Sequence, residues 1–291
     1  MNLVPEDLGS LPGTAYGSPD DCGSTKPDVR LIRHENGIGC ENAEFGYTRP
    51  LWVAWTAPLT NGSETLLARQ SKSTRRRSKA IIRQATELEE RIEPEVRRET
   101  LKEWKKIYDR HIASMPTGLN VVDKYASLDN LTNLSFAGYF DSGEMHAGVL
   151  FDTGSDPSTA RVRLSAATPN ARDAGLLRGL YHRVADYGAS LGCDSMSMGF
   201  DPNLFGHVVQ PGLCVFKLRI GFDPAPAQRY ADNPGYIDVT ECVVGPSGID
   251  ASLLLFEYAH DHALSMLGIR LGSPAEPPIG TEHIRRWIEA P

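Results

Sequence analysis

The stretch Leu134-Ser-Phe-Ala-Gly-Tyr-Phe140, then Asp141-Ser142-Gly143, then Glu144-Met-His-Ala-Gly-Val-Leu-Phe151 decides the fold. Two apolar runs joined by a short Asp-Ser-Gly connection predict a β-hairpin, because glycine and small polar residues favour tight turns. After this hairpin we expect a strand, an amphipathic helix capped by a glycine, and another strand, at residues 160–167, 171–191 and 193–198.

The flanking segments supply the other expected elements. Upstream we expect one strand and three helices, at residues 51–56, 64–93, 95–115 and 121–131. Downstream we expect two strands followed by two helices, at residues 212–222, 236–244, 250–267 and 284–288. This order predicts an α+β or mixed α/β fold, with a central, mostly antiparallel sheet flanked by helices.

Length and composition narrow the class of protein. The 291 residues, 41% of them hydrophobic, suffice for one large domain or two ordinary ones. No apolar run approaches the roughly 20 residues of a membrane span, and residues 1–28 lack the pattern of a secretory signal. The five cysteines are scattered without a C-x-x-C pair, which argues against a disulfide framework or a zinc site. We therefore expect a cytoplasmic protein with no metal and no membrane contact.

The charge is distributed unevenly. The net charge is -7, yet residues 69–83 contain only basic charges, so the rest of the chain is strongly acidic. A basic segment on an acidic molecule suggests a polyanionic partner. We assign donor binding to the side chains of this segment, namely Lys72, Arg75, Arg76, Arg77, Lys79 and Arg83. The alternative is a solvated helix face offset by the glutamates that follow it.

The run Gly212-Leu-Cys-Val-Phe-Lys-Leu-Arg-Ile-Gly-Phe222 places one lysine inside an apolar segment. A buried ammonium is costly unless another group pairs with it. In a strand, Lys217 and Phe216 would point to opposite faces of the sheet. Either Lys217 has a buried partner, or its stem carries the ammonium out to the surface.

The order of elements resembles the core of the Gcn5-related N-acyltransferase (GNAT) superfamily. Five features in sequence narrow the resemblance to its FemAB-like branch, which includes aminoacyl-tRNA-dependent peptidyltransferase-like enzymes. They are the basic helix, a helix with a Trp/Tyr stripe, the hairpin, a helix-to-strand passage and the Phe-Lys run, at residues 71–80, 101–112, 134–151, 187–194 and 212–222. The resemblance covers residues 64–226.

The resemblance implies a domain plan. Residues 1–60 would form a partly flexible N-terminal arm with the first strand, and residues 61–230 would form the acyltransferase core. Residues 231–291 would form a strand-helix extension that packs on or extends the core. The oligomeric state stays open, with a homodimer among the alternatives.

The resemblance also implies a mechanism. Lys217 would stabilise the oxyanion when an amine attacks the donor carbonyl, with Phe216 shaping the pocket and a backbone N–H at residues 164–166 assisting. Members that use CoA carry a glycine-rich loop before the central helix. Here residues 168–176 hold one glycine, and Asp173 would repel a pyrophosphate. Acetyl-CoA or another acyl-CoA is therefore the less expected donor, and aminoacyl-tRNA or the thioester of an acidic carrier protein is preferred. No tightly bound cofactor is expected.

A base must deprotonate the amine acceptor. The candidates for this role are His207 and Asp201, in the loop before the Phe-Lys run, and Glu144 and His146 on the hairpin; we assign it to the first two. The substrate pocket is assigned to five side chains of the expected strands, namely Tyr139, Glu144, His146, Arg163 and Ser165. A structural or surface role is the alternative for the candidate bases and for Glu144 and His146. For Tyr139, packing in the sheet is the favoured role.

The function expected from these residues is amide-forming acyl or aminoacyl transfer to a small-molecule amine, in peptide natural-product or cell-wall-type biosynthesis. One alternative is an ordinary acyl-CoA-dependent N-acyltransferase. Another is a non-catalytic module of the same fold that only docks RNA or a carrier protein.

Overall fold

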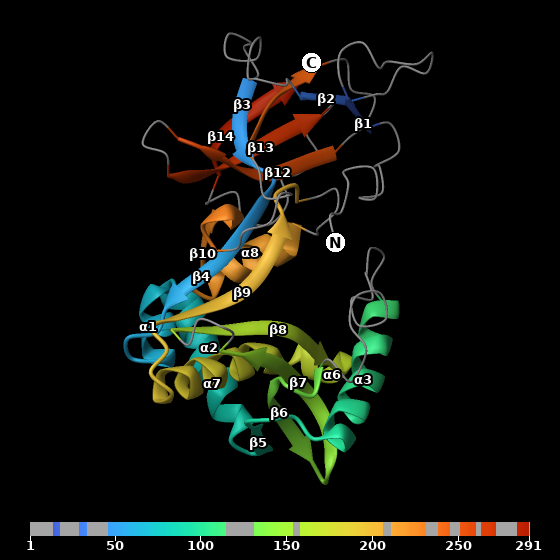
Figure 1. Ribbon diagram of the computed structural model, residues 1–291, viewed down its shortest axis with the longest axis vertical. Coiled ribbons are helices and arrows are strands. Elements are labelled where there is room, and N and C mark those ends of the chain that lie inside the picture. Colours follow the sequence, from blue (N-terminus) through green and yellow to red (C-terminus); the bar gives the residue numbers. More distant parts are fainter. Residues whose placement is uncertain are drawn as a thin grey trace. The chain divides into compact units, whose positions relative to one another are not determined.

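A computed structural model describes residues 14–17, 29–33, 46–114, 131–153, 158–205, 211–230, 238–244, 251–259, 263–271 and 284–290. The fold is mixed α/β with a central sheet flanked by helices, as predicted (Figure 1). The chain divides into two compact units. Unit 1 comprises Met1–Ala54, Phe200–Phe216 and Pro224–Pro291, and unit 2 comprises Trp55–Gly199 and Lys217–Asp223.

Unit 2 is built on the predicted hairpin. Its elements are α1 (Ser63–Arg69), α2 (Lys72–Ala85), β5 (Glu89–Glu93), α3 (Arg98–Ala113), β6 (Ser135–Asp141), β7 (Glu144–Asp152), β8 (Thr159–Ala167), α6 (Pro169–Asp173) and α7 (Leu176–Ser190). Four elements contain residues of both units: β4 (Trp52–Pro58), β9 (Ser195–Pro202), α8 (Pro211–Arg219) and β10 (Asp223–Pro226). The sheet has the order β10-β4-β9-β8-β7-β6-β5. Strands β5 to β8 pair antiparallel, and β8 pairs with β9 in parallel.

The turn between β6 and β7 confirms the hairpin prediction. Ser142 and Gly143 both have positive φ, at 51° and 85°. Two consecutive residues in this region are the mark of the turn that matches the twist of a hairpin. The register places Gly138 opposite Gly148.

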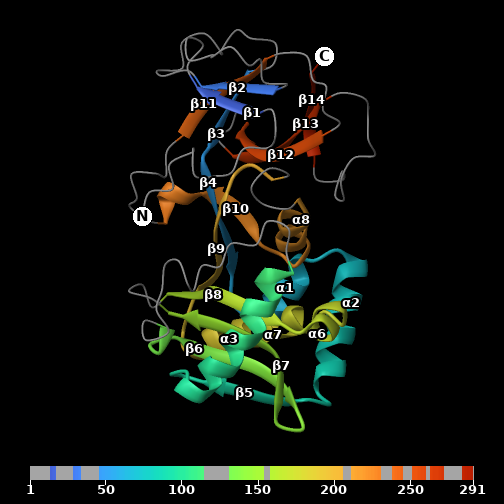
Figure 2. The ribbon, with the colours of Figure 1, turned by 90° about the vertical axis from the view of Figure 1, so that its right-hand side faces the viewer.

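Helix α3 covers one face of this hairpin (Figure 2). The Trp104 indole packs on Phe136 and donates a hydrogen bond to the carbonyl of Gly148 across 3.1 Å. A Cβ on Gly148 would lie 2.6 Å from the Phe136 ring and 2.7 Å from the Trp104 ring, so only glycine admits both rings here. Helix α7 packs on β6, β7 and β8, where Gly179 lies against the Tyr139 hydroxyl.

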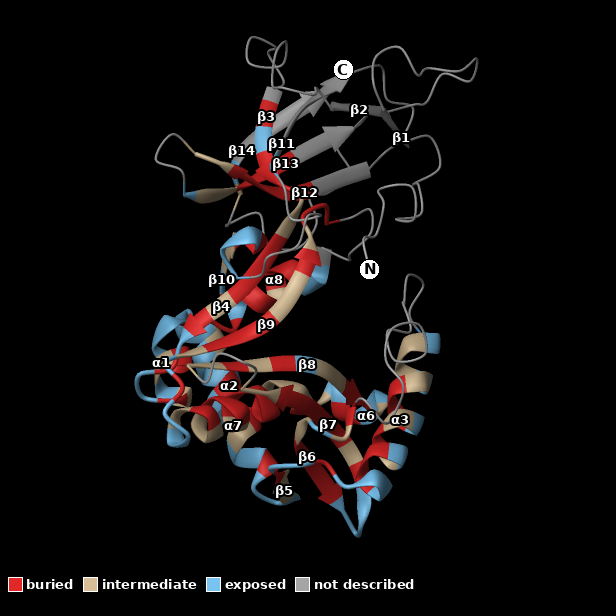
Figure 3. Cartoon of the chain, in the orientation of Figure 1, coloured by how far each residue is buried: buried red, intermediate tan, exposed pale blue. Residues whose placement is uncertain are grey.

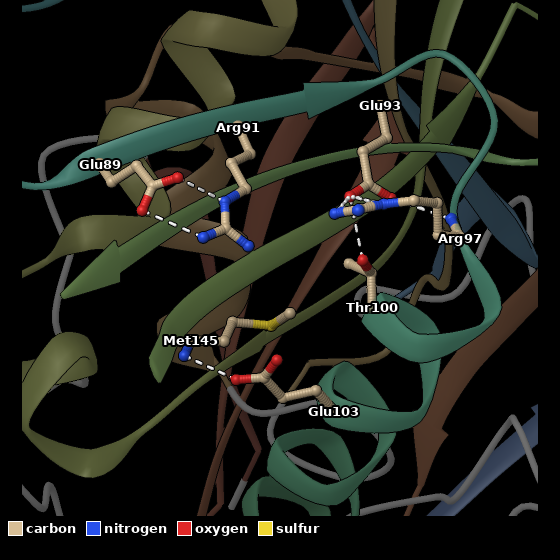
Figure 4. Close-up of polar contacts among 7 residues, drawn as sticks. All are labelled: Glu89, Arg91, Glu93, Arg97, Thr100, Glu103 and Met145. Carbon is tan, nitrogen blue, oxygen red and sulfur yellow. Dashed lines mark hydrogen bonds and ion pairs between the residues drawn. The ribbon is translucent and has the colours of Figure 1, made fainter. Parts of the chain in front are cut away.

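The carboxylate of Glu93, at the end of β5, anchors the start of α3 (Figure 4). It accepts hydrogen bonds from the backbone and guanidinium N–H groups of Arg97 at 2.6–2.9 Å and from the Thr100 hydroxyl at 2.9 Å. One turn later, the Glu103 carboxylate accepts the backbone N–H of Met145 in β7 at 2.7 Å. These bonds fix α3 to β5 and to β7.

Unit 1 is built mainly of strands. One sheet has the order β1-β2-β11-β3, from β1 (Thr14–Gly17), β2 (Val29–Arg33), β11 (Asp238–Val244) and β3 (Gly46–Pro50). A second sheet contains β12 (Ala251–Tyr258), β13 (Leu264–Leu271) and β14 (Ile284–Ala290). The buried Asn203 amide joins the two by donating to the carbonyls of Pro50 and Phe256 and accepting the N–H of Phe256. A 3-10 turn, η3 (Ala227–Arg229), follows β10.

Three expectations about single elements are wrong. Residues 212–219 belong to helix α8 rather than to a strand. The described residues within 250–267 form mainly the antiparallel pair β12 and β13 rather than a helix, and residues 284–288 belong to strand β14. Short apolar runs fit a buried strand or a buried helix equally well, and long-range pairing made the choice.

The helix expected at 64–93 is divided into three elements. Gln70, in extended conformation, ends the first element, and Ser71 caps α2, where its hydroxyl accepts the N–H of Thr74 at 3.3 Å. Residues 89–93 form β5, because they pair with β6 along their whole length. Of the helix expected at 121–131, residues 121–130 lie outside the described residues.

Candidate active site

Strands β8 and β9 separate after a short parallel pairing. Only Thr159–Arg161 of β8 pairs with Ser195–Ser197 of β9, although both strands continue in the same direction. On its other side, the pairing of β8 with β7 skips Arg163, which is therefore a bulged residue. In the described sheet, the β9 side of residues 162–167 is left without a strand partner. Such an edge presents backbone N–H groups to a ligand carbonyl, and the expected N–H at 164–166 lies within it.

Lys217 lies where β9 leaves β8. Its ammonium donates a hydrogen bond to the carbonyl oxygen of Met198, 3.1 Å away, and Met198 directly follows the last paired residue of β9. The ammonium also lies 5.4 Å from the centre of the Trp55 ring. The residue is 4% exposed, so the surface alternative for Lys217 is wrong. The charge is stabilised in place by a carbonyl dipole and an aromatic face.

The end of helix α8 is held by unit 2. Gly221, with φ 102°, terminates the helix. Its N–H donates a hydrogen bond to the carbonyl of Leu218, and the N–H of Phe222 donates one to the carbonyl of Lys217. The Gln70 amide donates to the carbonyl of Ile220 at 3.1 Å, and the Arg69 guanidinium donates to the carbonyl of Gly221 at 2.7 Å. The C-terminal end of α1 therefore fixes the turn that follows Lys217 and closes α8.

Gln70 also belongs to a buried polar network. Its side-chain oxygen accepts the Ser78 hydroxyl at 2.7 Å, and its amide nitrogen lies 3.4 Å from Nε2 of His182. Burial lowers the pKa of His182 to about 4, and nearby Arg178 lowers it while Asp186 opposes the shift. The imidazole is therefore neutral at physiological pH and ties α7 to the α1–α2 junction.

A hydroxyl pair lies on the open part of β8. The Tyr181 phenol, from α7, donates to the hydroxyl of Ser165 at 2.9 Å. Burial raises the pKa of Tyr181, although the bond to Ser165 acts in the opposite direction. The phenol is therefore a proton donor at neutral pH. The sequence predicts Ser165 in the substrate pocket, whereas Tyr181 is not among the predicted site residues.

The basic residues of α2 lie on an exposed stripe (Figure 3). The helix buries Ser78, Ile81 and Ala85 on one side. With 3.6 residues per turn, the side away from them carries four of the predicted donor-binding residues, namely Lys72, Arg76, Lys79 and Arg83, and the exposed Arg75 lies at its border. Arg75 turns back and donates to the carbonyls of Ala68 and Gln70.

The sixth basic residue, Arg77, belongs to a different group. Burial lowers the pKa of Arg178, in the first turn of α7, and the positive charges of Arg77 and Arg219 lower it further. Arg77 of α2 and Arg219 of α8 are therefore close enough to Arg178, near the start of α7, for their charges to act on it, and Gly175 with φ 77° directly precedes this helix. This combination suits a phosphate. No local pattern indicates Arg178 or Arg219 as site residues, because only the tertiary fold brings these helices together.

The other predicted site residues lie on several elements. Phe216 is half-buried in α8 and Asp201 is buried in β9, whereas His207 lies outside the described residues. The remaining pocket candidates lie on strands β6 to β8. Glu144 is exposed at the hairpin end, His146 is half-buried on β7, and Arg163 forms an ion pair with Asp152 at 2.6 Å.

Tyr139 is buried in the sheet. It lies on β6 against Gly179 of α7, where a Cβ on the glycine would be 3.1 Å from its hydroxyl. Burial and the Glu90 charge raise its pKa, although Arg183 acts in the opposite direction. Its surroundings agree with the packing role favoured from the sequence.

The described part of the chain also bears on metals and membranes. There, no cluster of three or more His, Cys, Asp or Glu side chains is arranged to hold a metal ion. Nor does that part of the chain contain a helix with the length and hydropathy of a membrane span.

Comparison with known proteins finds only distant structural similarity. No family model and no curated protein matches the chain. Among solved structures, L-PGS from Bacillus licheniformis is similar at 15% identity and a TM-score of 0.42, over 76% of this chain and 68% of that one. FemX is similar at 14% identity and a TM-score of 0.46, over 69% and 70%. A GCN5-related N-acetyltransferase from Kribbella flavida is similar at 10% identity and a TM-score of 0.35, over 77% and 70%.

Proposed function

We propose that this protein is an amide-forming acyltransferase that moves an aminoacyl or acyl group to a small-molecule amine. The observation that carries the proposal is the buried ammonium of Lys217, fixed on the Met198 carbonyl where β8 and β9 separate. A cation held in a water-poor site next to a free strand edge is suited to a developing oxyanion. Such a charge is costly to bury, which favours a functional reason for its presence.

The reaction follows ordinary acyl-transfer chemistry. The amine nitrogen attacks the donor carbonyl carbon, a C–N bond forms, and the carbonyl electrons move to oxygen. Lys217 and the N–H groups of β8 stabilise this oxyanion. When the carbonyl re-forms, the bond to the donor oxygen or sulfur breaks, and the proton that the amine nitrogen loses passes to the leaving group. The Ser165 hydroxyl accepts a hydrogen bond from the Tyr181 phenol, so its own hydrogen is free to be donated to the leaving group.

We infer that the donor is aminoacyl-tRNA or the thioester of an acidic carrier protein. The exposed basic stripe on α2 supports this inference, because an acidic protein with one basic helix face is suited to a polyanion. The arginine group at the start of α7 supports a phosphate-bearing donor in the same way. That group suits the pyrophosphate of CoA as well, so an acyl-CoA donor is the second candidate.

Reconstituted transfer with the full chain tests the proposal. A pool of labelled aminoacyl-tRNA, an acylated carrier protein and acetyl-CoA would be offered in turn with a panel of amines. We expect amide formation from one macromolecular donor and a loss of at least about tenfold in kcat for Lys217→Ala. Lys102→Ala, at an exposed position on α3, is the matched control and should react normally.

Each other outcome has a defined meaning. Transfer from acetyl-CoA alone would overturn the donor assignment and favour the second candidate. Absence of transfer from every donor, with retained tRNA or carrier binding, would overturn catalysis and favour a docking module. Lys217→Arg keeps the charge and serves as the second variant if Lys217→Ala fails to fold. Wild-type turnover by a folded Lys217→Ala variant would remove Lys217 from the mechanism.

A further inference from the structure

Unit 1 contains an open pocket that the proposed acyl transfer does not use. Its volume is about 840 Å³, within the range of small-molecule sites. It lies among the ends of β3, β10, η3, β11 and β12, and its lining residues are Thr48, Pro226, Gln228, Arg229, Asp238, Tyr258 and Ala259. All of them belong to unit 1.

One carboxylate oxygen in this pocket is fixed by two donors. Oδ1 of Asp238 accepts the Tyr258 hydroxyl at 2.8 Å and the Gln228 amide at 2.7 Å. Burial and the contact with Asp238 raise the pKa of Tyr258, so the phenol keeps its proton and donates. Among the described residues, no group donates a hydrogen bond to the second oxygen, Oδ2. The carboxylate is therefore oriented, with one oxygen open to a ligand.

A guanidinium lines the same pocket. Arg229 lies close enough to Tyr258 for its charge to act against the rise in the pKa of that phenol. Within the described residues, Arg229 and Asp238 form no ion pair with each other. Opposite charges that share a pocket without neutralising each other are suited to a ligand that carries both charges.

We propose that this pocket binds a small zwitterion of the free amino-acid class. The ligand ammonium would be bound by Oδ2 of Asp238, and its carboxylate by the Arg229 fork in bidentate geometry. Pro226, Ala259 and the Tyr258 ring provide apolar surface for the ligand side chain. The proposal does not depend on Lys217, because all the groups involved belong to unit 1.

Calorimetric titration of the full chain with each of the common free amino acids tests this proposal. We expect at least one amino acid to bind, and its N-acetyl and amide derivatives, which lack one charge each, to bind at least tenfold more weakly. Arg229→Gln should weaken zwitterion binding about tenfold but leave binding of the amide derivative unchanged. Asp238→Asn should weaken binding of the amide derivative, which keeps the ammonium. It should leave binding of the N-acetyl derivative, which lacks the ammonium, unchanged. Arg285→Gln, at an exposed position on β14, is the matched control.

Failure would be clear and separate from failure of the acyltransferase proposal. The inference is overturned if no amino acid binds at millimolar concentration, or if Arg229→Gln binds it as the unchanged protein does. Arg229 makes no hydrogen bond to a described residue, so its variant stays informative even if Asp238→Asn does not fold. Lys217→Ala should leave amino-acid binding intact. A loss of binding in that variant would place the ligand in the Lys217 site and overturn the inference.

Discussion

The ammonium nitrogen of Lys217 lies 3.1 Å from the carbonyl oxygen of Met198. This hydrogen bond joins the last turn of α8 to β9, at the residue where β9 leaves β8. Lys217→Met keeps the length of the side chain and removes its charge. Relief of charge burial should offset the lost hydrogen bond, so the free energy of unfolding should change by no more than about 1–2 kcal/mol. Turnover should fall at least about tenfold. Urea unfolding and the transfer assay measure the two effects. Loss of stability with retained turnover would identify a structural lysine.

The basic stripe of α2 predicts salt-sensitive binding of a polyanion. We expect the triple variant R76Q/K79Q/R83Q to bind tRNA more weakly and with a log-log salt slope that is shallower by about 2–3. The matched control K102Q/K106Q/R110Q removes the same charge from exposed positions on α3. Filter binding over a range of salt concentrations compares them. Equal losses in both variants would mean that net charge alone, and not the α2 stripe, attracts the partner.

Two glycines at opposite ends of α8 should respond oppositely to alanine. Gly221 has φ 102°, and a Cβ there would lie 3.0 Å from the carbonyl oxygen of Leu66, so Gly221→Ala should cost about 1–3 kcal/mol. Gly212, in the first turn, faces open space, so Gly212→Ala should stabilise by about 0.5–1 kcal/mol. Thermal unfolding measures both changes. A neutral Gly221→Ala would show that the turn after Lys217 is not constrained.

The buried imidazole of His182 makes stability depend on pH. Its folded pKa, about 4, lies below the ordinary value of 6.5, so the unfolded chain binds a proton more readily. Stability should therefore be complete above pH 6.5 and fall towards pH 4, by about 3 kcal/mol in all. His182→Gln should lose this component. Urea unfolding at several pH values measures it, and parallel profiles for the two proteins would contradict the prediction.

The Glu93 carboxylate should stabilise unit 2 through α3. Burial raises its pKa, but the hydrogen bonds from Arg97 and Thr100 outweigh burial and hold the pKa below 4.5. This stabilisation is present above the unfolded value and is lost as the pH falls through the folded pKa. Glu93→Gln should cost about 1–2 kcal/mol at neutral pH. Glu89→Gln, on the same strand but exposed, is the control and should leave the unfolding midpoint unchanged. Equal effects would exclude a special role for Glu93.

Local sequence was sufficient to predict the core of unit 2. The Asp-Ser-Gly turn specifies a hairpin because few residues accept two successive positive φ angles. The spacing of Leu101, Trp104 and Tyr108 specifies one buried face of α3. The C-terminal residues could not be assigned in this way, since runs such as Leu253-Leu-Leu-Phe256 fit a helix until β13 pairs with them.

The candidate site was only partly predictable. The cost of burying one ammonium in an apolar run singled out Lys217, whatever element contains it. By itself, then, the sequence determined the hairpin, the main helices and a lysine that requires a partner. Tertiary structure alone decided which carbonyl that partner is, that α8 is a helix, and which arginines and carboxylates share a site. These depend on contacts between residues far apart in the chain, whose pairing no local period encodes.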